Sequence, residues 1–458
     1  MMRPAMTRTT QLALRADLLD FTATPHWGSP TMYGVRFRPD HWLLIDADGR
    51  IAGAEPAAHF TPGPDWLQQD HRGQLLLPGF IDTHVHAPQM DVIASWGASL
   101  LEWLETYTFP AEQRYADPAL AAEGAARFLD ALLAHGTTAA VVFPTVHRAS
   151  AEALFEAAML RGMRLVTGKV LMDRHAPEGL RDDVAGAQAD CEALIQRWHG
   201  RGRNAYAVTV RFAVTSTPEQ LAMAGALCQR HGGNRGNGGV YMQTHVAENR
   251  DEVAWVARLF PEARSYLDVY HRAGLLHERA VLAHGIWLDA HDRALLRDTG
   301  AHIAHSPSSN LFLGSGLFDW PAAIDTGHGV SIATDVGGGT SLSMTRTLAD
   351  AYKVQALRGT PLNAWVALHA ATRGAAQVLG LGTEIGSLEP GAMADLALWH
   401  WAQGPVAAHR DAVATGATTG LAAQPLHARV FAWLTLADER NLAATYVAGR
   451  LMKGVTGM

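Results

Sequence analysis

Cysteine is scarce in this sequence. The 458 residues include only Cys191 and Cys228, so neither a disulfide framework nor a Cys-x-x-Cys metal site is expected. Cations are also few, because 37 lysine and arginine residues stand against 44 aspartate and glutamate residues and give a formal net charge of −7. Surfaces that bind nucleic acid carry clustered lysine and arginine, so this balance argues against a nucleic-acid partner.

Long apolar runs are missing as well. No segment reaches the roughly 18 to 20 strongly apolar residues that are needed to span a bilayer. The first twenty residues include basic side chains, but Arg15, Asp17 and Asp20 interrupt their apolar run, which argues against a signal peptide. These absences predict a cytoplasmic protein without a membrane partner.

Histidine, by contrast, is abundant, with 23 residues. Imidazole binds metal ions and exchanges protons near neutral pH, so this excess points to a metal site or to proton transfer. Apolar residues make up 48% of the chain and charged residues 18%, a balance typical of a globular protein with a large core.

Both ends of the chain have the pattern of short strands. Asp48 and Gly49 separate two apolar runs, which predicts a tight hairpin, because glycine accepts the positive φ of such a turn. Near the other end, 393–401 and 444–452 are short apolar segments. Two strand-rich ends around a different middle predict one small β-sandwich domain made from both termini.

Strands and helices alternate in the middle of the chain. Eight apolar runs are expected to be strands: 78–86, 137–145, 163–172, 206–216, 239–248, 279–287, 301–309 and 329–337. Helices are expected over 117–136, with Asp117 as N-cap, and over 217–232, with Thr217 as N-cap. Continuously apolar strands that alternate with helices indicate a parallel sheet covered on both faces. Eight such strands predict an α/β fold of the closed (β/α)8 TIM-barrel class, and a doubly wound open sheet is the alternative. The predicted parts are the N-terminal β-segment (1–76), the catalytic barrel (77–383) and the C-terminal β-segment (384–458).

Polar residues follow the predicted barrel strands at their carboxyl ends, where the active sites of such barrels form. His84 and His86 lie two residues apart on one strand, so their side chains point to the same side. An HxH pair alone is weak evidence for a metal site. His245 and Asp335 at the ends of later strands complete a possible ligand set of three imidazole nitrogens and one carboxylate oxygen. This set suits Zn²⁺ or Fe²⁺ and leaves a position for water. Glu248, three residues beyond His245, is placed for general acid–base catalysis.

Further blocks spread over nearly the whole chain follow the pattern of one family in order. They are LLPGFIDTHVH (76–86), HVAE (245–248), LAHG (282–285), HSPSSN (305–310), ATDVGGG (333–339) and EIGSLEPGAMADLAL (384–398). On these blocks the chain resembles the amidohydrolase superfamily of metal-dependent hydrolases. Within it, 83–91, 100–117, 211–219 and 244–253 are similar to the barrel-type guanine deaminases. The resemblance implies hydrolysis of guanine to xanthine and ammonia by a metal-activated water.

The resemblance also implies a role for each candidate residue, one Zn²⁺ ion (with Fe²⁺ as the alternative metal) and a homodimer. The implied metal ligands are His84, His86, His245 and Asp335; the implied catalytic residues are Glu248, Asp335 and His284; the implied purine contacts are Gln89, Arg211, Phe212 and His284.

Relatives with two metals often bridge them through a modified lysine on the fourth strand. That strand carries Arg211 here and no lysine, which favours a single metal. Lys169 on the third strand is expected to pack or to face solvent.

Three further segments each carry an expectation of their own, and the first of them has two interpretations. Residues 100–110 have the periodicity of an amphipathic helix packed on the barrel, whereas the resemblance implies a cover over the pocket. The glycine-rich 232–239 lacks the spacing of a phosphate loop and is expected to be a flexible surface connection. The segment 336–341 is expected to bring backbone close to a pocket.

Two other functions remain open. The chain could be a related amidohydrolase that acts on another purine or on a triazine, as 8-oxoguanine, adenosine-type and triazine deaminases do. A relative that has lost catalysis could serve as a scaffold, although all four predicted ligands and Glu248 are present. The nucleotide-modifying zinc deaminases with His/Cys ligands are excluded, because the chain has no PCxxC sequence.

Overall fold

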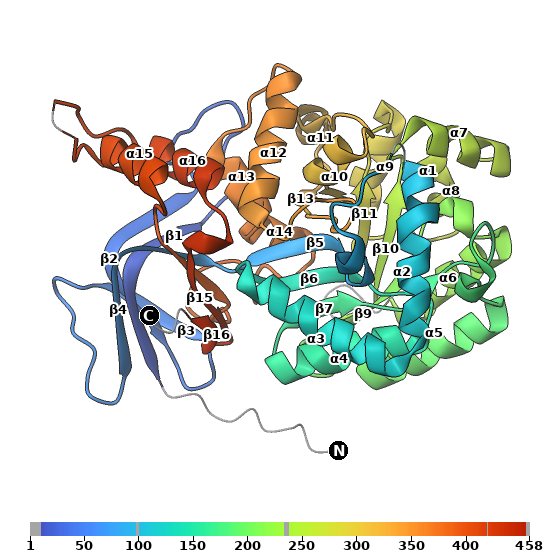
Figure 1. Ribbon diagram of the computed structural model, residues 1–458, viewed down its shortest axis with the longest axis horizontal. Coiled ribbons are helices and arrows are strands. Elements are labelled where there is room, and N and C mark those ends of the chain that lie inside the picture. Colours follow the sequence, from blue (N-terminus) through green and yellow to red (C-terminus); the bar gives the residue numbers. More distant parts are fainter. Residues whose placement is uncertain (1–10, 98–99, 233–237, 419, 455–458) are drawn as a thin grey trace.

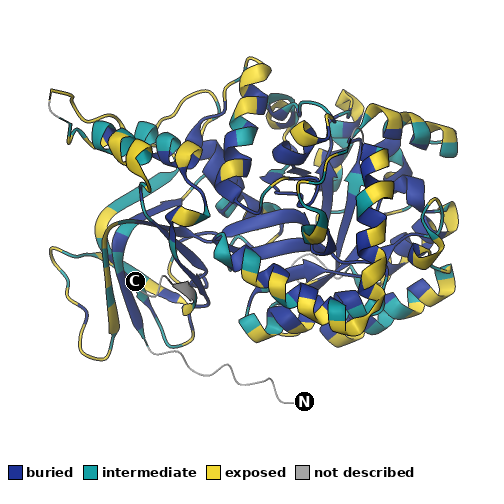
Figure 2. Ribbon diagram, in the orientation of Figure 1, coloured by how far each residue is buried: buried dark blue, intermediate teal, exposed yellow. Residues whose placement is uncertain are grey.

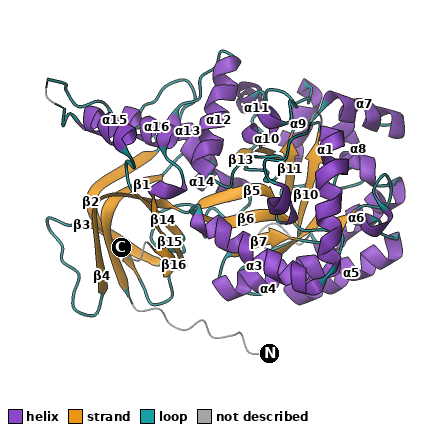
Figure 3. Ribbon diagram, in the orientation of Figure 1, coloured by secondary structure: helices purple, strands orange, loops and turns teal. Residues whose placement is uncertain are grey.

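The computed structural model describes residues 11–97, 100–232, 238–418 and 420–454. It has two parts: a barrel of parallel strands ringed by helices, and a curved sheet that contains both ends of the chain (Figure 1). Figure 3 shows the strands of the barrel inside its helices. The predicted (β/α)8 barrel with a small β-domain from both termini is therefore confirmed, while the boundaries at 76/77 and 383/384 stay a prediction.

The barrel strands follow one another around a ring, and neighbouring strands are parallel. They are β5 (Phe80–His86), β6 (Thr137–Phe143), β7 (Arg164–Thr167) with β8 (Val170–Leu171), β9 (Asn204–Val210), β10 (Tyr241–Val246), β11 (Ala280–His284), β12 (His302–His305) and β13 (Val330–Ile332). The ring closes where the amide nitrogen of Asp335 donates to the carbonyl oxygen of His84 at 2.9 Å, and that of His86 to the carbonyl oxygen of Val336 at 2.8 Å. This closure excludes the open sheet.

The barrel strands are rich in apolar residues because almost every residue in them is buried. β5, β6, β9 and β11 are buried along their whole length. Helices cover the outside of the barrel, and its strands are coloured as buried in Figure 2, as a parallel barrel requires. β9 ends at Val210, so Arg211 and Phe212 lie just beyond the strand and not within it as predicted.

The helices begin where the sequence places N-caps. The Asp117 carboxylate accepts from the amide nitrogen of Ala119, and the Thr217 hydroxyl accepts from that of Gln220. The helices from the first cap to the end of the barrel are α3 (Pro118–Ala134), α4 (Arg148–Arg161), η4 (Glu178–Leu180), α5 (Val184–Trp198), η5 (Ala213–Thr215), α6 (Pro218–His231), α7 (Arg250–Leu259), α8 (Tyr266–Arg272), α9 (Ala290–Thr299), α10 (Pro307–Phe312), α11 (Trp320–Thr326), α12 (Met344–Leu357), α13 (Ala364–Ala370) and α14 (Arg373–Val378).

A helical segment between β5 and α3 lies at the carboxyl ends of the strands, and we call residues 100–113 of it the cover segment. In chain order the elements here are η1 (Pro88–Val92), α1 (Leu100–Trp103), the π-helical turn η2 (Leu104–Thr108), α2 (Phe109–Gln113) and η3 (Arg114–Ala116). Its apolar residues are buried and its charged residues mostly exposed, so the amphipathic pattern expected from the sequence is present.

The two ends of the chain form one hydrogen-bonded sheet with the strand order β16-β15-β14-β4-β1-β2-β3. Its strands are β1 (Leu12–Phe21), β2 (Val35–Ile45), β3 (Ile51–Pro56), β4 (Leu67–Pro78), β14 (Leu396–Trp399), β15 (Leu442–Val447) and β16 (Arg450–Gly454). The hairpin predicted at Asp48 and Gly49 joins β2 and β3, where Ile45 lies opposite Ile51.

The C-terminal segment also contains helices that the sequence pattern did not predict. α15 (Pro405–Thr415), α16 (Leu426–Leu436) and η6 (Glu439–Asn441) lie between β14 and β15, and α16 packs against α12 and α13 of the barrel. Most of the glycine-rich 232–239 lies outside the described residues. Over the described ranges, no helix combines the length and the apolar character that crossing a bilayer requires.

Candidate active site

Histidine side chains from the first strand and from β10 meet at the carboxyl end of the barrel. The Nε2 atom of His86 lies 3.2 Å from the Nε2 atoms of both His84 and His245. The Oδ1 atom of Asp335 lies 3.1 Å from His84 Nε2 and 3.3 Å from His86 Nε2. All four predicted metal ligands are therefore brought together, including both members of the HxH pair. We call His84, His86, His245 and Asp335, with the adjacent His284, the metal-binding cluster.

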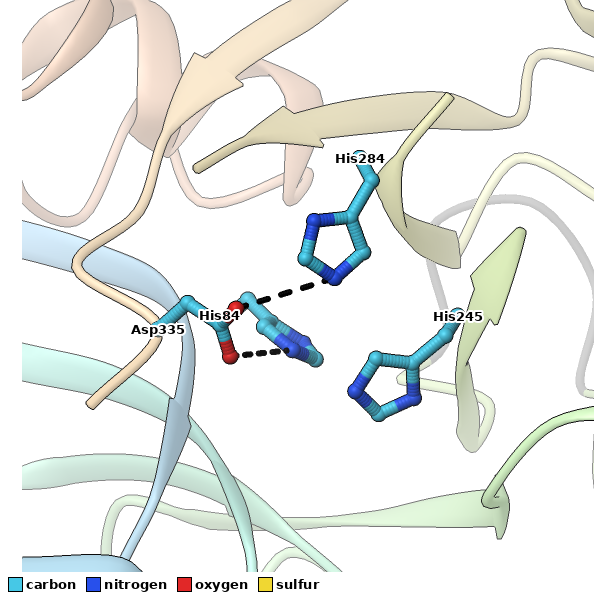
Figure 4. A group of neighbouring side chains, drawn as sticks. All are labelled: His84, His245, His284 and Asp335. Atoms are coloured by element: carbon cyan, nitrogen blue, oxygen red, sulfur yellow. Dashed lines mark ion pairs between the residues drawn. The ribbon is translucent and has the colours of Figure 1, made fainter. Parts of the chain in front are cut away.

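His284 at the end of β11 joins this group. One potential ligand atom from each of His84, His245, His284 and Asp335 lies within 4.8 Å of the others (Figure 4). His284 Nε2 faces the second carboxylate oxygen of Asp335, Oδ2, at 3.6 Å. His284 is thus close enough to be a fifth ligand or to contact a water bound at the site.

The donor set and its spacing fit a small divalent cation. Ligand atoms about 2.0–2.2 Å from a tetrahedral zinc ion lie about 3.3–3.6 Å from one another. The spacings of 3.1–3.3 Å between ring nitrogens and the Asp335 oxygen are close to that value. Two imidazole lone pairs at this distance repel each other, and a cation at the centre would accept the lone pairs of all three nitrogens at once. The chemistry of the residues present therefore matches a metal centre.

Hydrogen bonds fix how two of the rings are turned. His245 Nδ1 lies 2.6 Å from the carbonyl oxygen of Arg211, and His284 Nδ1 lies 2.8 Å from Oδ1 of Asn310. Each Nδ1–H donates to its oxygen, which leaves the Nε2 lone pair directed to the centre of the cluster. Within the described part of the chain, the buried Nε2 of His284 has no hydrogen-bond partner.

The electrostatics of the cluster suit a bound cation. Burial lowers the pKa of His86 to about 3, and burial together with the neighbouring histidines lowers the pKa of His245 well below its ordinary value. Burial acts to raise the pKa of Asp335, but the imidazoles of His84 and His86 outweigh it and hold this pKa well below its usual range. His86 and His245 therefore present neutral nitrogens and Asp335 presents a carboxylate, the protonation states that metal ligands require.

A buried carboxylate beneath the cluster fixes two of its members. Asp82 accepts hydrogen bonds from the amide nitrogens of His84 at 3.3 Å and Thr334 at 3.0 Å, and from the Thr334 hydroxyl at 2.5 Å. Burial raises the pKa of Asp82 to about 6. This side chain ties the first strand to the last and holds the backbone that carries His84 and Asp335.

Glu248 lies beside the cluster and is almost completely buried. Its Oε1 accepts from the Ser315 hydroxyl at 2.9 Å, and its Oε2 lies 3.5 Å from Nε2 of His284. Burial, reinforced by the nearby Asp335 carboxylate, raises the pKa of Glu248 to about 8. A carboxyl group of this kind can hold a proton near neutral pH and give it up, which is the property of a general acid–base catalyst.

The backbone that carries these groups is unusual at three positions. Ala247, His284 and Asp335 have positive φ angles of 47°, 71° and 51°, although none of them is a glycine. Each position costs about 1–3 kcal/mol, and such residues cluster at functional sites. All three lie at the carboxyl ends of the barrel strands β10, β11 and β13, where the backbone turns the side chains of the site inward.

A cavity of about 430 Å³ opens beside the metal-binding cluster. Its lining includes the implied purine contacts Gln89, Arg211 and Phe212 and the implied catalytic residue Glu248. Apolar residues of the cover segment also line it: Leu100, Trp103 and Leu104. The cover segment thus forms one wall of the cavity, as the resemblance implied.

Glycines near Asp335 bring backbone close to this cavity. The amide nitrogen of Gly337 donates to Oε1 of Gln89 at 3.1 Å, and Gly338 contributes to the cavity lining. A Cβ atom on Gly337 would lie 2.6 Å from the carbonyl oxygen of Gln89, so only glycine fits there. The close approach expected for 336–341 is confirmed.

The amidohydrolase family model matches residues 75–452, which include the whole barrel and most of the C-terminal segment. The chain belongs to the amidohydrolase family. It is 41% identical over 447 residues to guanine deaminase of Escherichia coli (strain K12), and this alignment covers 97% of this chain and 98% of that protein.

Solved structures agree with this assignment. The structure of E. coli guanine deaminase matches this amidohydrolase with a TM-score of 0.88 at 40% identity, over 97% of this chain and 99% of that one. The crystal structure of guanine deaminase from Bradyrhizobium japonicum matches with a TM-score of 0.89 at 32% identity, over 98% of this chain and 100% of that one.

Lys169 of this amidohydrolase does not reach the metal-binding cluster's ligands. Its Nζ atom lies 2.5 Å from Oδ1 of Asp182, and its side chain is buried. The expected packing role is consistent with this ion pair, although the side chain does not face solvent.

Sequence reasoning missed several buried residues of the site, and two of them contact catalytic or purine-binding side chains. Ser315 hydrogen-bonds Glu248, and Glu112 of α2 contacts both Gln89 and Arg211. Glu112 lies within the block 100–117, whose similarity to guanine deaminases was the available signal, but nothing in the pattern distinguishes it from its exposed neighbours. Its partner Arg211 is far away in sequence and becomes adjacent only in the folded barrel.

Proposed function

We propose that this amidohydrolase is a guanine deaminase that converts guanine and water to xanthine and ammonia. The observation that carries the proposal is the meeting, in one cavity, of the metal-binding cluster with Glu248 and with the side chains of Gln89, Arg211 and Phe212. The extensive similarity to guanine deaminases of E. coli and B. japonicum supports the choice of purine.

We propose that His84, His86, His245 and Asp335 hold one Zn²⁺ ion, with Fe²⁺ as the alternative. A divalent cation there would lower the pKa of a bound water to about 7 and so supply hydroxide at neutral pH. Lys169 is engaged by Asp182, which supports a single metal. The homodimer and the cytoplasmic location stay predictions.

The residues around the cavity divide the remaining work between holding the purine and moving protons. Arg211 suits the 6-oxygen of guanine because a guanidinium is a planar and permanently charged donor. Gln89 offers a donor and an acceptor to the edge of the ring, and Phe212 offers an apolar face to the base. Leu100, Trp103 and Leu104 exclude water from the bound base, which strengthens the polar contacts inside.

Proton transfer falls to the two carboxyl groups beside the reacting carbon. Attack of water at C2 makes that carbon tetrahedral and places negative charge on the ring. Glu248 gives its proton to the ring nitrogen and regains one from the new C2 hydroxyl as the carbonyl of xanthine forms, and Asp335 takes a proton from the attacking water and passes it to the departing ammonia. His284, whose Nε2 faces both carboxylates, keeps the water oriented.

The test is to add guanine to purified protein of known metal content and to follow xanthine by absorbance and ammonia by a coupled assay. Parallel assays with 8-oxoguanine, adenosine and an aminotriazine cover the related activities. We expect the largest kcat/KM for guanine. A larger value for any other substrate would reassign the activity within the family, and no ammonia from any of them would indicate a scaffold protein.

A further inference from the structure

Glu112 is a carboxylate with no exposed surface at the mouth of the barrel. Its Oε1 and Oε2 atoms lie 2.9 Å and 2.7 Å from Nη1 of Arg211. Its Oε1 also accepts a hydrogen bond from Nε2 of Gln89 at 3.2 Å. One buried side chain therefore contacts both polar residues that the proposed function assigns to the purine.

The three partners come from separate parts of the chain. Gln89 lies in η1, Glu112 in α2 of the cover segment, and Arg211 just beyond β9. The amide of Gln89 is held at both ends, because its Oε1 accepts from the amide nitrogen of Gly337 while its Nε2 donates to Glu112. Glu112 therefore sets the orientation of the Gln89 amide as well as that of the guanidinium.

The contact leaves most of the Arg211 guanidinium available. In the described ranges, Arg211 forms side-chain hydrogen bonds through Nη1 alone, and the ring of Phe109 packs 5.4 Å from its Cζ atom. The remaining N–H groups belong to a side chain that lines the cavity. A buried cation without a partner is unfavourable, so Glu112 stabilises the Arg211 guanidinium in this position and keeps it directed to the cavity.

We infer that Glu112 is a positioning residue that aligns Arg211 and Gln89 for a purine with a 6-oxo group. This rests on the proposed function. Donors fixed in this way match a carbonyl oxygen at C6 and oppose an amino group there, because an amino group presents hydrogens to hydrogens. Glu112 thus contributes to the selection of 6-oxopurines over 6-aminopurines without touching the substrate.

Inhibition constants test this separately from turnover. Hypoxanthine carries the 6-oxo group but lacks the 2-amino group that is removed, whereas purine lacks both. The ratio of the purine to the hypoxanthine inhibition constant, measured against guanine deamination, reports the contribution of the 6-oxygen. In Glu112→Gln we expect this ratio to fall about 10-fold or more, and kcat/KM for guanine to fall about 100-fold, as is typical when a reacting group is misplaced by about 1 Å.

Two further variants make the result specific. Glu105→Gln replaces an exposed carboxylate of the same cover segment and should leave the ratio unchanged. Arg211→Gln should abolish the dependence on the 6-oxygen, and adding Glu112→Gln to it should cause only a small further loss, because the contact with Gln89 is then the only positioning contact left for Glu112 to lose. Metal content and the thermal midpoint are measured in every variant to identify misfolding.

The outcomes are distinct. If Glu112→Gln weakens hypoxanthine and purine equally, or if its effect adds fully to that of Arg211→Gln, Glu112 has only a structural role and the inference is wrong. If the unmodified protein releases no ammonia from guanine, the proposed function is wrong. An equilibrium binding assay then tests the inference by itself: it survives if hypoxanthine binds more tightly than purine, and it is wrong if hypoxanthine does not.

Discussion

The amide nitrogen of Asp335 donates to the carbonyl oxygen of His84 at 2.9 Å, so the first and last barrel strands are joined at the residues that also face each other in the metal-binding cluster. Closure of the barrel consequently brings these two members of the cluster side by side. Asp82 supports both, since it accepts hydrogen bonds from the amide nitrogen of His84 and from that of Thr334, the residue before Asp335.

Asp82→Asn should weaken metal binding about 10- to 100-fold, because the amide cannot accept all three hydrogen bonds that the carboxylate accepts. Metal retained during titration with a chelator measures this. Thr334→Val is the matched control, because it removes only the hydroxyl bond and should have a smaller effect. Equal metal affinity in Asp82→Asn and the unmodified protein would show that this support is dispensable.

Glu248→Gln should keep the metal and the fold but lose about 10²- to 10⁴-fold in kcat, since the amide cannot transfer a proton. Steady-state rates with metal analysis measure this. Ser315→Ala leaves the carboxyl group in place and removes only its hydrogen bond, so its loss should be much smaller. Near-normal turnover of Glu248→Gln would exclude Glu248 from the chemistry.

Removal of the metal with a chelator should abolish deamination, and adding Zn²⁺ or Fe²⁺ to the apoprotein should restore it. His245→Ala should bind the metal too weakly to be restored in this way, because one of the nitrogens of the cluster is lost. Elemental analysis of the purified protein then distinguishes zinc from iron. Full activity of a metal-free sample would contradict the proposed mechanism.

Glu384 gives the barrel a pH-dependent contact. Burial acts to raise its pKa, but hydrogen bonds and charge from Arg164 and Arg203 lower it below the ordinary value of 4.5. The carboxylate therefore stabilises the fold above pH 4.5, and this contribution is lost as the pH falls through the lowered pKa.

Glu384→Gln should accordingly reduce the free energy of unfolding at pH 7 by about 1.5–3 kcal/mol, the range for hydrogen bonds to charged groups. The urea midpoint of variant and parent, measured from pH 7 to pH 3, checks this. The two midpoints should converge at the acid end. A difference that stays constant over the whole range would mean that the charge of Glu384 contributes nothing.

The barrel could be predicted because its signals are local. Each strand is a short apolar run between a turn and a helix cap, and strand ends in such a barrel all meet at one face. The placement of His84, His86, His245 and Asp335 around one point follows from that geometry alone. The turn at Asp48 and Gly49 is also a local signal, and it identified the hairpin near one end of the chain. Pairing of the two ends was inferred because both have the pattern of short strands.

β1 was missed for a physical reason. Asp17 and Asp20 interrupt its apolar run, so the sequence does not read as a strand. In the folded chain Asp20 is fully buried because Arg36 of the neighbouring β2 neutralises it at 2.5 Å. A charged residue can occupy a buried strand position when a partner compensates it, and that partner is identified only by the pairing of the strands.

The sequence by itself determined which side chains could hold a metal and on which face of the barrel they lie, because the two-residue period of a strand and the repeated strand–helix order are written along the chain. Only the tertiary structure decided how the purine side of the cavity is held. Glu112 and Arg211 are buried opposite charges from distant segments, and their attraction has an effect only once folding has removed both from water.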